Sequence, residues 1–203
     1  EYGDMSITVG EKKIATAEEF LAIGDSAAAL KKQYVLTEDL DFGTVGSADF
    51  VVKGTFSGGL KGNGHTITGL DGVMFEKING GSVSDLTIEG TRLTRNTQKG
   101  ALANEIRNAD VQDIRIKDLV IENNTDQAGG LAGIISGSTV KRIAVENISA
   151  RSSNTIGGVA GQFDGRILED CIVTGSLEGT IRHQMGTRIG GITGWMGGGT
   201  MKK

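Results

Sequence analysis

A glycine-rich motif that recurs at a nearly constant interval constrains this chain more than any other feature. The three clearest copies begin at Gly129, Gly157 and Gly190, and two weaker copies begin at Gly72 and Gly100. Successive copies are 28, 29, 28 and 33 residues apart. A period of this length is typical of proteins built from stacked structural repeats, each of which contacts mainly its two neighbours.

Five other positions of the repeat keep an apolar character from copy to copy. Counted from the anchoring glycine, they are the second, sixth, eleventh, fourteenth and sixteenth residues. The second holds Met74, Leu102, Leu131, Val159 and Ile192; the sixth holds Ile78, Ile106, Ile135, Phe163 and Met196; the eleventh holds Val83, Val111, Val140, Leu168 and Met201; the fourteenth holds Leu86, Ile114, Ile143 and Cys171; the sixteenth holds Ile88, Ile116, Val145 and Val173. The last two positions lie two residues apart with polar residues around them, which is the alternation of a β-strand and not the 3.6-residue period of a helix.

A unit of this size, with short strands and tight corners, fits one turn of a three-sided parallel coil. We therefore predict an all-β fold, a right-handed parallel β-helix of about 28 residues per coil, in which each side chain stacks on its counterpart about 4.8 Å away. Residues near the eighth position are expected to form corners with positive φ, namely Gly80, Asn108, Gly137, Gly165 and Gly198. A leucine-rich repeat would need a Leu-x-x-Leu-x-Leu pattern, and a propeller would need blades of about 40–45 residues.

The two ends of the chain differ from the repeats and from each other. Thr16 and Glu19 have the spacing of a capping box, which predicts a short helix through Phe20 and Ile23. We expect residues 1–45 to form an N-terminal cap, made of this helix and leading strands, that covers the open end of the coils. Residues 46–203 are expected to form the coils, with the last coil incomplete and the chain a fragment of a larger protein.

Composition excludes several classes of function. A formal charge of −4 without a Lys/Arg run argues against a nucleic-acid partner. No apolar run reaches the roughly 18–20 residues that cross a bilayer, so no membrane insertion is expected. Cys171 is the single cysteine, which excludes an internal disulfide, and its place in an apolar column predicts a small buried side chain.

The residues that carry most enzyme chemistry are sparse. A zinc site needs clustered ligands, but the chain has only two histidines, His65 and His183, and no His-Glu-x-x-His motif. The thirteenth position of the repeat stacks Asp85, Asp113, Arg142 and Asp170. Two adjacent carboxylates could bind Ca²⁺ or act as an acid/base pair, but the neighbouring arginine favours an exposed ionic ladder. We therefore predict no catalytic, cofactor-binding or metal-binding residue, and we expect His65 to cap a turn or pack on the next coil.

One insertion interrupts the period, between Gly179 and Thr187, and accounts for the 33-residue interval. Insertions in solenoids project from one face and often carry contacts with partners. Arg182 and His183 are therefore candidate partner-contact residues, the alternative being a plain solvated loop.

The glycine motifs resemble those of a known family. The motif Gly-Leu-uncharged-Gly, called GLUG, is matched three times, by Gly130, Leu131 and Gly133, by Gly158, Val159 and Gly161, and by Gly191, Ile192 and Gly194. The two segments 34–42 and 56–70 also resemble the sequence that leads into such repeats. Together these features resemble the β-helical N-terminal region of the streptococcal IgA1-specific zinc metallopeptidases and related zinc metalloproteases.

This resemblance implies a structural or binding module, without catalysis of its own, in a secreted or wall-attached bacterial zinc metalloendopeptidase. Zinc and the protease domain would then lie downstream in the parent protein, the location would be extracellular or at the cell surface, and a host glycoprotein or immunoglobulin would be a possible partner. The alternative is the stalk or binding domain of a surface adhesin with no enzyme attached. A β-helix that cleaves carbohydrate would need a groove lined by carboxylates, which the sequence does not supply.

Overall fold

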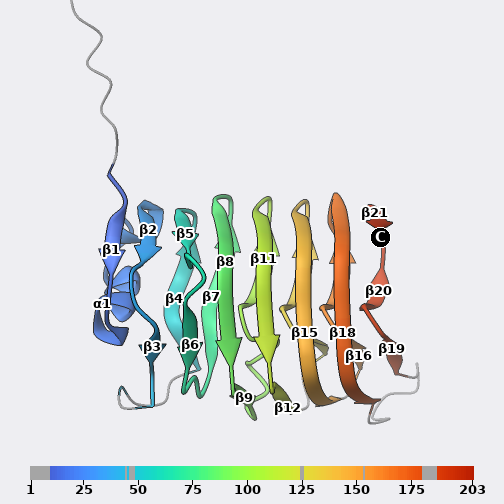
Figure 1. Cartoon of the computed structure of the whole chain (residues 1–203). Coiled ribbons are helices and arrows are strands. Elements are labelled where there is room, and N and C mark those ends of the chain that lie inside the picture. Colours follow the sequence, from blue (N-terminus) through green and yellow to red (C-terminus); the bar gives the residue numbers. More distant parts are fainter. Residues whose placement is uncertain (1–9, 44, 46–48, 124–125, 153, 180–186) are drawn as a thin grey trace, which may run out of the picture.

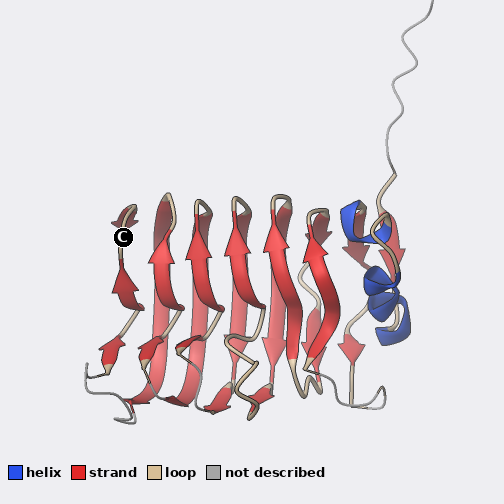
Figure 2. Cartoon of the chain, turned by 180° about the vertical axis from the view of Figure 1, so that it is seen from behind, coloured by secondary structure: helices blue, strands red, loops and turns tan. Residues whose placement is uncertain are grey.

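The computed structural model describes residues 10–43, 45, 49–123, 126–152, 154–179 and 187–203. Its strands stack in register along one axis and form a parallel β-solenoid (Figure 1), as the repeat predicts. The strands belong to three sheets that run along this axis. Helical turns lie only at the N-terminal end among the described residues (Figure 2).

The largest sheet has twelve strands, and the other two have six and three. The first contains β1 (Lys12–Ile14), β2 (Gln33–Leu36), β3 (Leu40–Asp41), β5 (Gly59–Lys61), β6 (Thr66–Thr68), β8 (Ser82–Glu89), β9 (Arg92–Leu93), β11 (Asp110–Lys117), β12 (Val120–Glu122), β15 (Thr139–Ser152), β18 (Ile167–Gly179) and β21 (Thr200–Lys202). The second contains β4 (Phe50–Phe56), β7 (Val73–Asn79), β10 (Ala103–Arg107), β14 (Ala132–Ser136), β17 (Ala160–Asp164) and β20 (Thr193–Met196). The third contains β13 (Gln127–Gly129), β16 (Thr155–Gly157) and β19 (Arg188–Gly190).

The register of the strands confirms the predicted apolar columns. Val111 pairs with Val83 on one side and with Val140 on the other, and Ile114 lies in the same way between Leu86 and Ile143. The sixth-position column is also continuous, from Ile78 to Met196. Most of these side chains are fully buried, and they form one core that runs the length of the solenoid.

The corners of each coil are residues in the left-handed region, and they recur at the eighth, thirteenth and eighteenth positions. These residues are Gly80, Asn108 and Gly137 at the eighth, Asp85, Asp113, Arg142 and Asp170 at the thirteenth, and Gly90, Asp118, Asn147 and Gly175 at the eighteenth. The prediction was wrong for Gly165 and Gly198, which lie outside this region; Gly199 adopts it instead. The corner at the thirteenth position explains why the inward positions on either side of it are three residues apart and not two.

A helical segment covers the first coil, as the capping box predicts. Helix α1 (Ala17–Leu21) begins after Thr16, whose hydroxyl accepts a hydrogen bond from the Glu19 amide, while the Glu19 carboxylate accepts one from the Ala15 amide. The 3₁₀ turns η1 (Ala22–Asp25) and η2 (Ala29–Lys31) follow. Phe20 inserts its ring 5.9 Å from that of Phe75, so this segment closes the core.

The boundary at residue 45 stays a prediction. Strands β2 and β3, which precede it, already pair in parallel with β5 and β6 of the next coil. The covering segment is therefore continuous with the coil ladder at this end.

Candidate functional site

The GLUG glycines lie where the second and third sheets meet. The first glycine of the motif faces the next coil: a β-carbon on Gly130 would lie 2.3 Å from the carbonyl oxygen of Gly158, and one on Gly158 would lie 2.2 Å from that of Gly191. No atom lies within 4 Å of the corresponding position on Gly191. These distances are far below van der Waals contact, so a side chain at the first two positions would push neighbouring coils apart.

The glycine at the fourth position of the motif faces the third sheet instead. A β-carbon on Gly161 would lie 2.7 Å from the amide nitrogen of Ala128 in β13, and one on Gly194 would lie 2.6 Å from the carbonyl oxygen of Ile156 in β16. The residues between the glycines, Leu131 and Val159, are fully buried in the core, and Ile192 packs against it. The glycines of the motif therefore allow neighbouring strands to pack closely, and the residues between them fill the core. This arrangement supports a structural role for the motif.

In the copy that begins at Gly100, Asn104 occupies the fourth position of the motif, where the later copies have glycine. In this copy the chain forms a loop where the later copies have a strand of the third sheet. The side-chain oxygen of Asn104 accepts a hydrogen bond from the Lys99 amide at 2.8 Å, and its side-chain nitrogen donates one to the carbonyl of Thr97. The Lys99 carbonyl then accepts a hydrogen bond from the Gly129 amide, at the edge of β13. The loop Thr94–Lys99 thus protects the edge of the third sheet.

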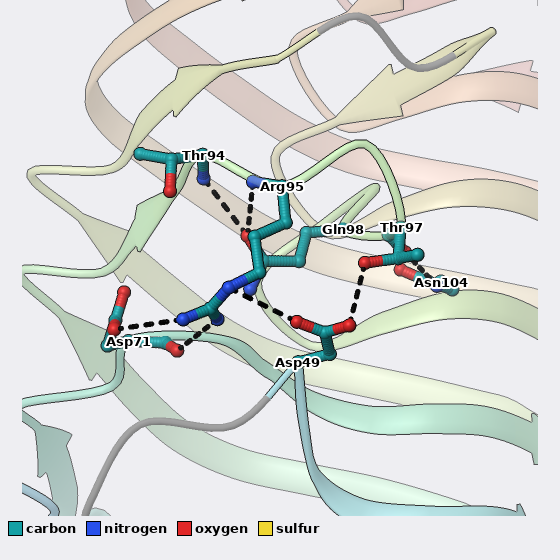
Figure 3. A network of polar contacts seen from close by, with 7 residues as sticks. All are labelled: Asp49, Asp71, Thr94, Arg95, Thr97, Gln98 and Asn104. Atoms are coloured by element: carbon teal, nitrogen blue, oxygen red, sulfur yellow. Dashed lines mark hydrogen bonds and ion pairs between the residues drawn. The ribbon is translucent and has the colours of Figure 1, made fainter.

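Arg95 ties this loop to two earlier segments (Figure 3). Its guanidinium group lies 3.3 Å from the carboxylate of Asp49 and 3.6 Å from that of Asp71. Gln98 is fully buried behind it, and its side-chain oxygen accepts hydrogen bonds from the amides of Thr94 and Arg95. Sequence reasoning missed this network, although the replacement of a motif glycine by Asn104 was a visible signal for part of it.

Among the stacked charges at the thirteenth position, Arg142 forms one ion pair, with Asp113, which is one step of the ionic ladder expected from the sequence. Arg142 donates hydrogen bonds from Nε and Nη2 to the two carboxylate oxygens of Asp113, at 2.6 and 2.7 Å. This contact lowers the pKa of Asp113 and raises that of Arg142. A polar groove of about 370 Å³ lies over these residues and Asp85 on the outer face of the large sheet. Because Asp113 is held by Arg142, it is poorly suited to act in an acid/base pair with Asp85.

His65 contacts Asp39, one coil away. The His65 Nδ1 atom lies 3.2 Å from a carboxylate oxygen of Asp39, and the Thr66 amide donates a hydrogen bond to the same oxygen at 2.8 Å. The amide hydrogen bond, followed by the contact with His65, lowers the pKa of Asp39. His65 therefore fastens a turn to the preceding coil. The described residues include no group of three His, Cys, Asp or Glu side chains that could hold a metal ion.

Cys171 lies in its predicted column, but the prediction of a buried side chain holds only in part, because the residue is half-buried. Burial raises the pKa of its thiol to about 11, so the neutral form dominates near pH 7 and the group is a poor nucleophile. The two candidate partner-contact residues, Arg182 and His183, lie outside the described residues. Within the described part of the chain, no helix is long and apolar enough to cross a membrane.

Comparisons with known proteins extend this picture. Residues 23–118 match the family model described as the M26 IgA1-specific metallo-endopeptidase N-terminal region. An immunoglobulin A1 protease of Streptococcus sanguinis is 28% identical over 130 residues, which are 58% of this chain and 7% of that protein. The zinc metalloprotease ZmpC of Streptococcus pneumoniae is 25% identical in an alignment of 243 residues in length, which covers 96% of this chain and 13% of that protein.

A crystal structure of a candidate immunoglobulin A1 protease from Bacteroides ovatus has the same fold. It superimposes with a TM-score of 0.69 at 17% identity, over 92% of this chain and 62% of that one. The chain thus spans only a small part of its curated relatives. Residues 23–118 are similar to the N-terminal region of the M26 IgA1-specific metallo-endopeptidases, and the resemblance predicted from the glycine motifs of the chain is confirmed.

Proposed function

We propose that this chain is a non-catalytic structural module of a secreted or cell-wall-attached bacterial zinc metalloendopeptidase. In this role it holds the downstream protease domain at a distance and helps to present a large host glycoprotein, such as an immunoglobulin, to that domain. The observation that carries the proposal is the continuous register of coils around a single core. A stack of this kind is stiff along its axis, because each coil packs on its neighbours over its whole perimeter.

The pairing of charged side chains on the described surface supports a structural role. The charged side chains of the large sheet pair along the axis, for example Lys141 with Glu169 at 2.9 Å and Arg115 with Glu146 at 3.5 Å. The charges of such pairs neutralise each other, and the pairs stabilise neighbouring coils only weakly, since their side chains are at least partly exposed to solvent. The similarity to immunoglobulin A1 proteases and to a zinc metalloprotease favours this assignment over a stand-alone adhesin.

The test uses the complete gene product with and without residues 10–203, and human immunoglobulin A1 as the substrate. For a positioning module we expect the shortened enzyme to keep its kcat on a short peptide substrate, because the reacting groups are untouched. On the intact immunoglobulin its kcat/KM should fall about tenfold or more, which corresponds to about 1.4 kcal/mol of lost positioning. Equal losses on both substrates, or cleavage by residues 1–203 alone, would contradict the proposal.

A further inference from the structure

The polar groove on the outer face of the large sheet crosses the middle coils of the solenoid, where β8, β11 and β15 lie side by side (Figure 1). Its volume of about 370 Å³ falls within the range of pockets that bind small molecules or single side chains. Gly64 and Ala144 border it and carry no long side chain, which leaves the space open. The charged residues that line it are Asp85, Asp113, Arg115 and Arg142.

Three of these four charges already have a partner in the chain. Arg142 donates two hydrogen bonds to Asp113, and Arg115 lies 3.5 Å from the carboxylate of Glu146 in the following coil. Asp85 is exposed and forms no ion pair with any residue that the structure describes. The groove therefore presents one carboxylate whose charge is not neutralised from within the described chain.

The stacking of the coils explains why Asp85 differs from Asp113. The strand register places Asp85 beside Asp113, and Asp113 beside Arg142, one coil apart in each case. All three have a left-handed backbone, with φ between 51° and 57°, so they occupy equivalent corners. Arg142 binds the carboxylate of the preceding coil from its own corner. A guanidinium group that bound Asp85 in the same way would have to come from position 113, which holds a carboxylate instead.

We propose that Asp85 and the groove around it bind an arginine side chain of a polypeptide partner. Charge complementarity selects a cation, and the Arg142–Asp113 pair shows that a carboxylate at this corner accepts a guanidinium through two hydrogen bonds of 2.6 and 2.7 Å. Asp113 also assists, because a carboxylate has about four lone-pair sites and Arg142 uses only two of them. Arginine is favoured over lysine, since its planar fork matches a carboxylate and an ammonium group does not. This binding is an activity beyond the proposed positioning role and does not depend on it.

Titration of the ¹⁵N-labelled chain with the blocked tripeptide acetyl-Gly-Arg-Gly-amide, followed by NMR, tests the proposal. We expect saturable shifts of the amide signals of Thr87, Ile114 and Arg115, with a dissociation constant on the order of 1 mM, because a single exposed ion pair binds weakly. The same peptide with citrulline, which keeps the shape of arginine but carries no charge, should give no saturable shift. The lysine peptide should bind about threefold more weakly or worse.

Asp85→Asn should weaken binding of the arginine peptide about tenfold or more. Asparagine suits this corner, because Asn108 and Asn147 already adopt the left-handed conformation at other corners, so the variant should fold and keep its spectrum. Asp110→Asn is the matched control: Asp110 is exposed at the start of β11, outside the groove, and its replacement should leave binding unchanged. The absence of saturable shifts with the arginine peptide would overturn the proposal. So would equal binding of the citrulline or lysine peptide, unchanged binding by Asp85→Asn, or an equal loss in Asp110→Asn.

Discussion

The α-carbon of Gly158 faces the carbonyl oxygen of Gly191 so closely that a β-carbon there would lie 2.2 Å from that oxygen. The same motif position one coil further along, at Gly191, has open space around it. These two equivalent positions of the repeat differ in what packs on them: a β-carbon on Gly158 would meet both the Gly191 carbonyl and the side chain of Val173, whereas one on Gly191 would meet no atom within 4 Å. Substitutions at the two positions can therefore separate two effects of the GLUG glycine: the close packing that it allows in the folded state and the flexibility that it gives the unfolded chain.

We predict that Gly158→Ala destabilises the fold by about 2 kcal/mol, because the added methyl group forces adjacent coils apart. Gly191→Ala is the matched control and should be neutral or slightly stabilising, since alanine restricts the unfolded chain. The free energy of unfolding from urea titrations of dilute protein measures both. Equal effects at the two positions would show that coil contact is not what selects glycine.

Two neighbouring residues of β15 test which way the strand faces. Ile143 is 1% exposed and stacks between Ile114 and Cys171, whereas Ala144 lies on the outer face between Arg115 and Ile172. We expect Ile143→Asp to cost about 4 kcal/mol, because a carboxylate must be buried without a partner. Ala144→Asp should change the unfolding free energy by less than about 0.5 kcal/mol. A similar loss for both variants in thermal or urea denaturation would contradict the register.

The apolar columns could be predicted from the sequence because burial acts on each position of the coil directly and in the same way in each copy. The corner at the thirteenth position was also readable in principle. Inward residues at the eleventh and fourteenth positions are an odd number apart, so a strand must bend between them, at Asp113 in the second copy. The Arg95 contacts gave no such signal, since Asp49 and Asp71 lie outside the regular strands and their positions do not recur.

The Arg142–Asp113 pair predicts a specific dependence of stability on pH. Hydrogen bonds from Arg142 hold the pKa of Asp113 below its usual value, which is about 3.9 in an unfolded chain. The stabilisation is therefore fully present above pH of about 4 and is lost as the pH falls through the lowered folded pKa. Arg142→Gln should reduce stability slightly at pH 7, and the difference from the wild type should shrink below pH of about 3.

Arg166→Gln provides the control for this effect. Arg166 is exposed and forms no ion pair within the described part of the chain, so its replacement removes the same charge without breaking the Arg142–Asp113 pair. Urea titrations at each pH measure both variants. A pH-dependent loss of the same size in Arg166→Gln would assign the effect to net charge instead of to the pair.

Cys171 gives a chemical probe of the last coils. Its thiol has a pKa raised to about 11 by burial, against about 8.5 for a free cysteine, so at pH 8 the reactive thiolate is rarer by a factor on the order of 100. We expect alkylation by iodoacetamide to be slower than that of a model thiol by at least this factor, and to accelerate as the pH rises toward 11. Unfolding in guanidinium should restore the rate of the model thiol. Rapid labelling of the folded chain at pH 8 would mean that the coil around Cys171 opens readily, because a thiol held in its neutral form reacts slowly.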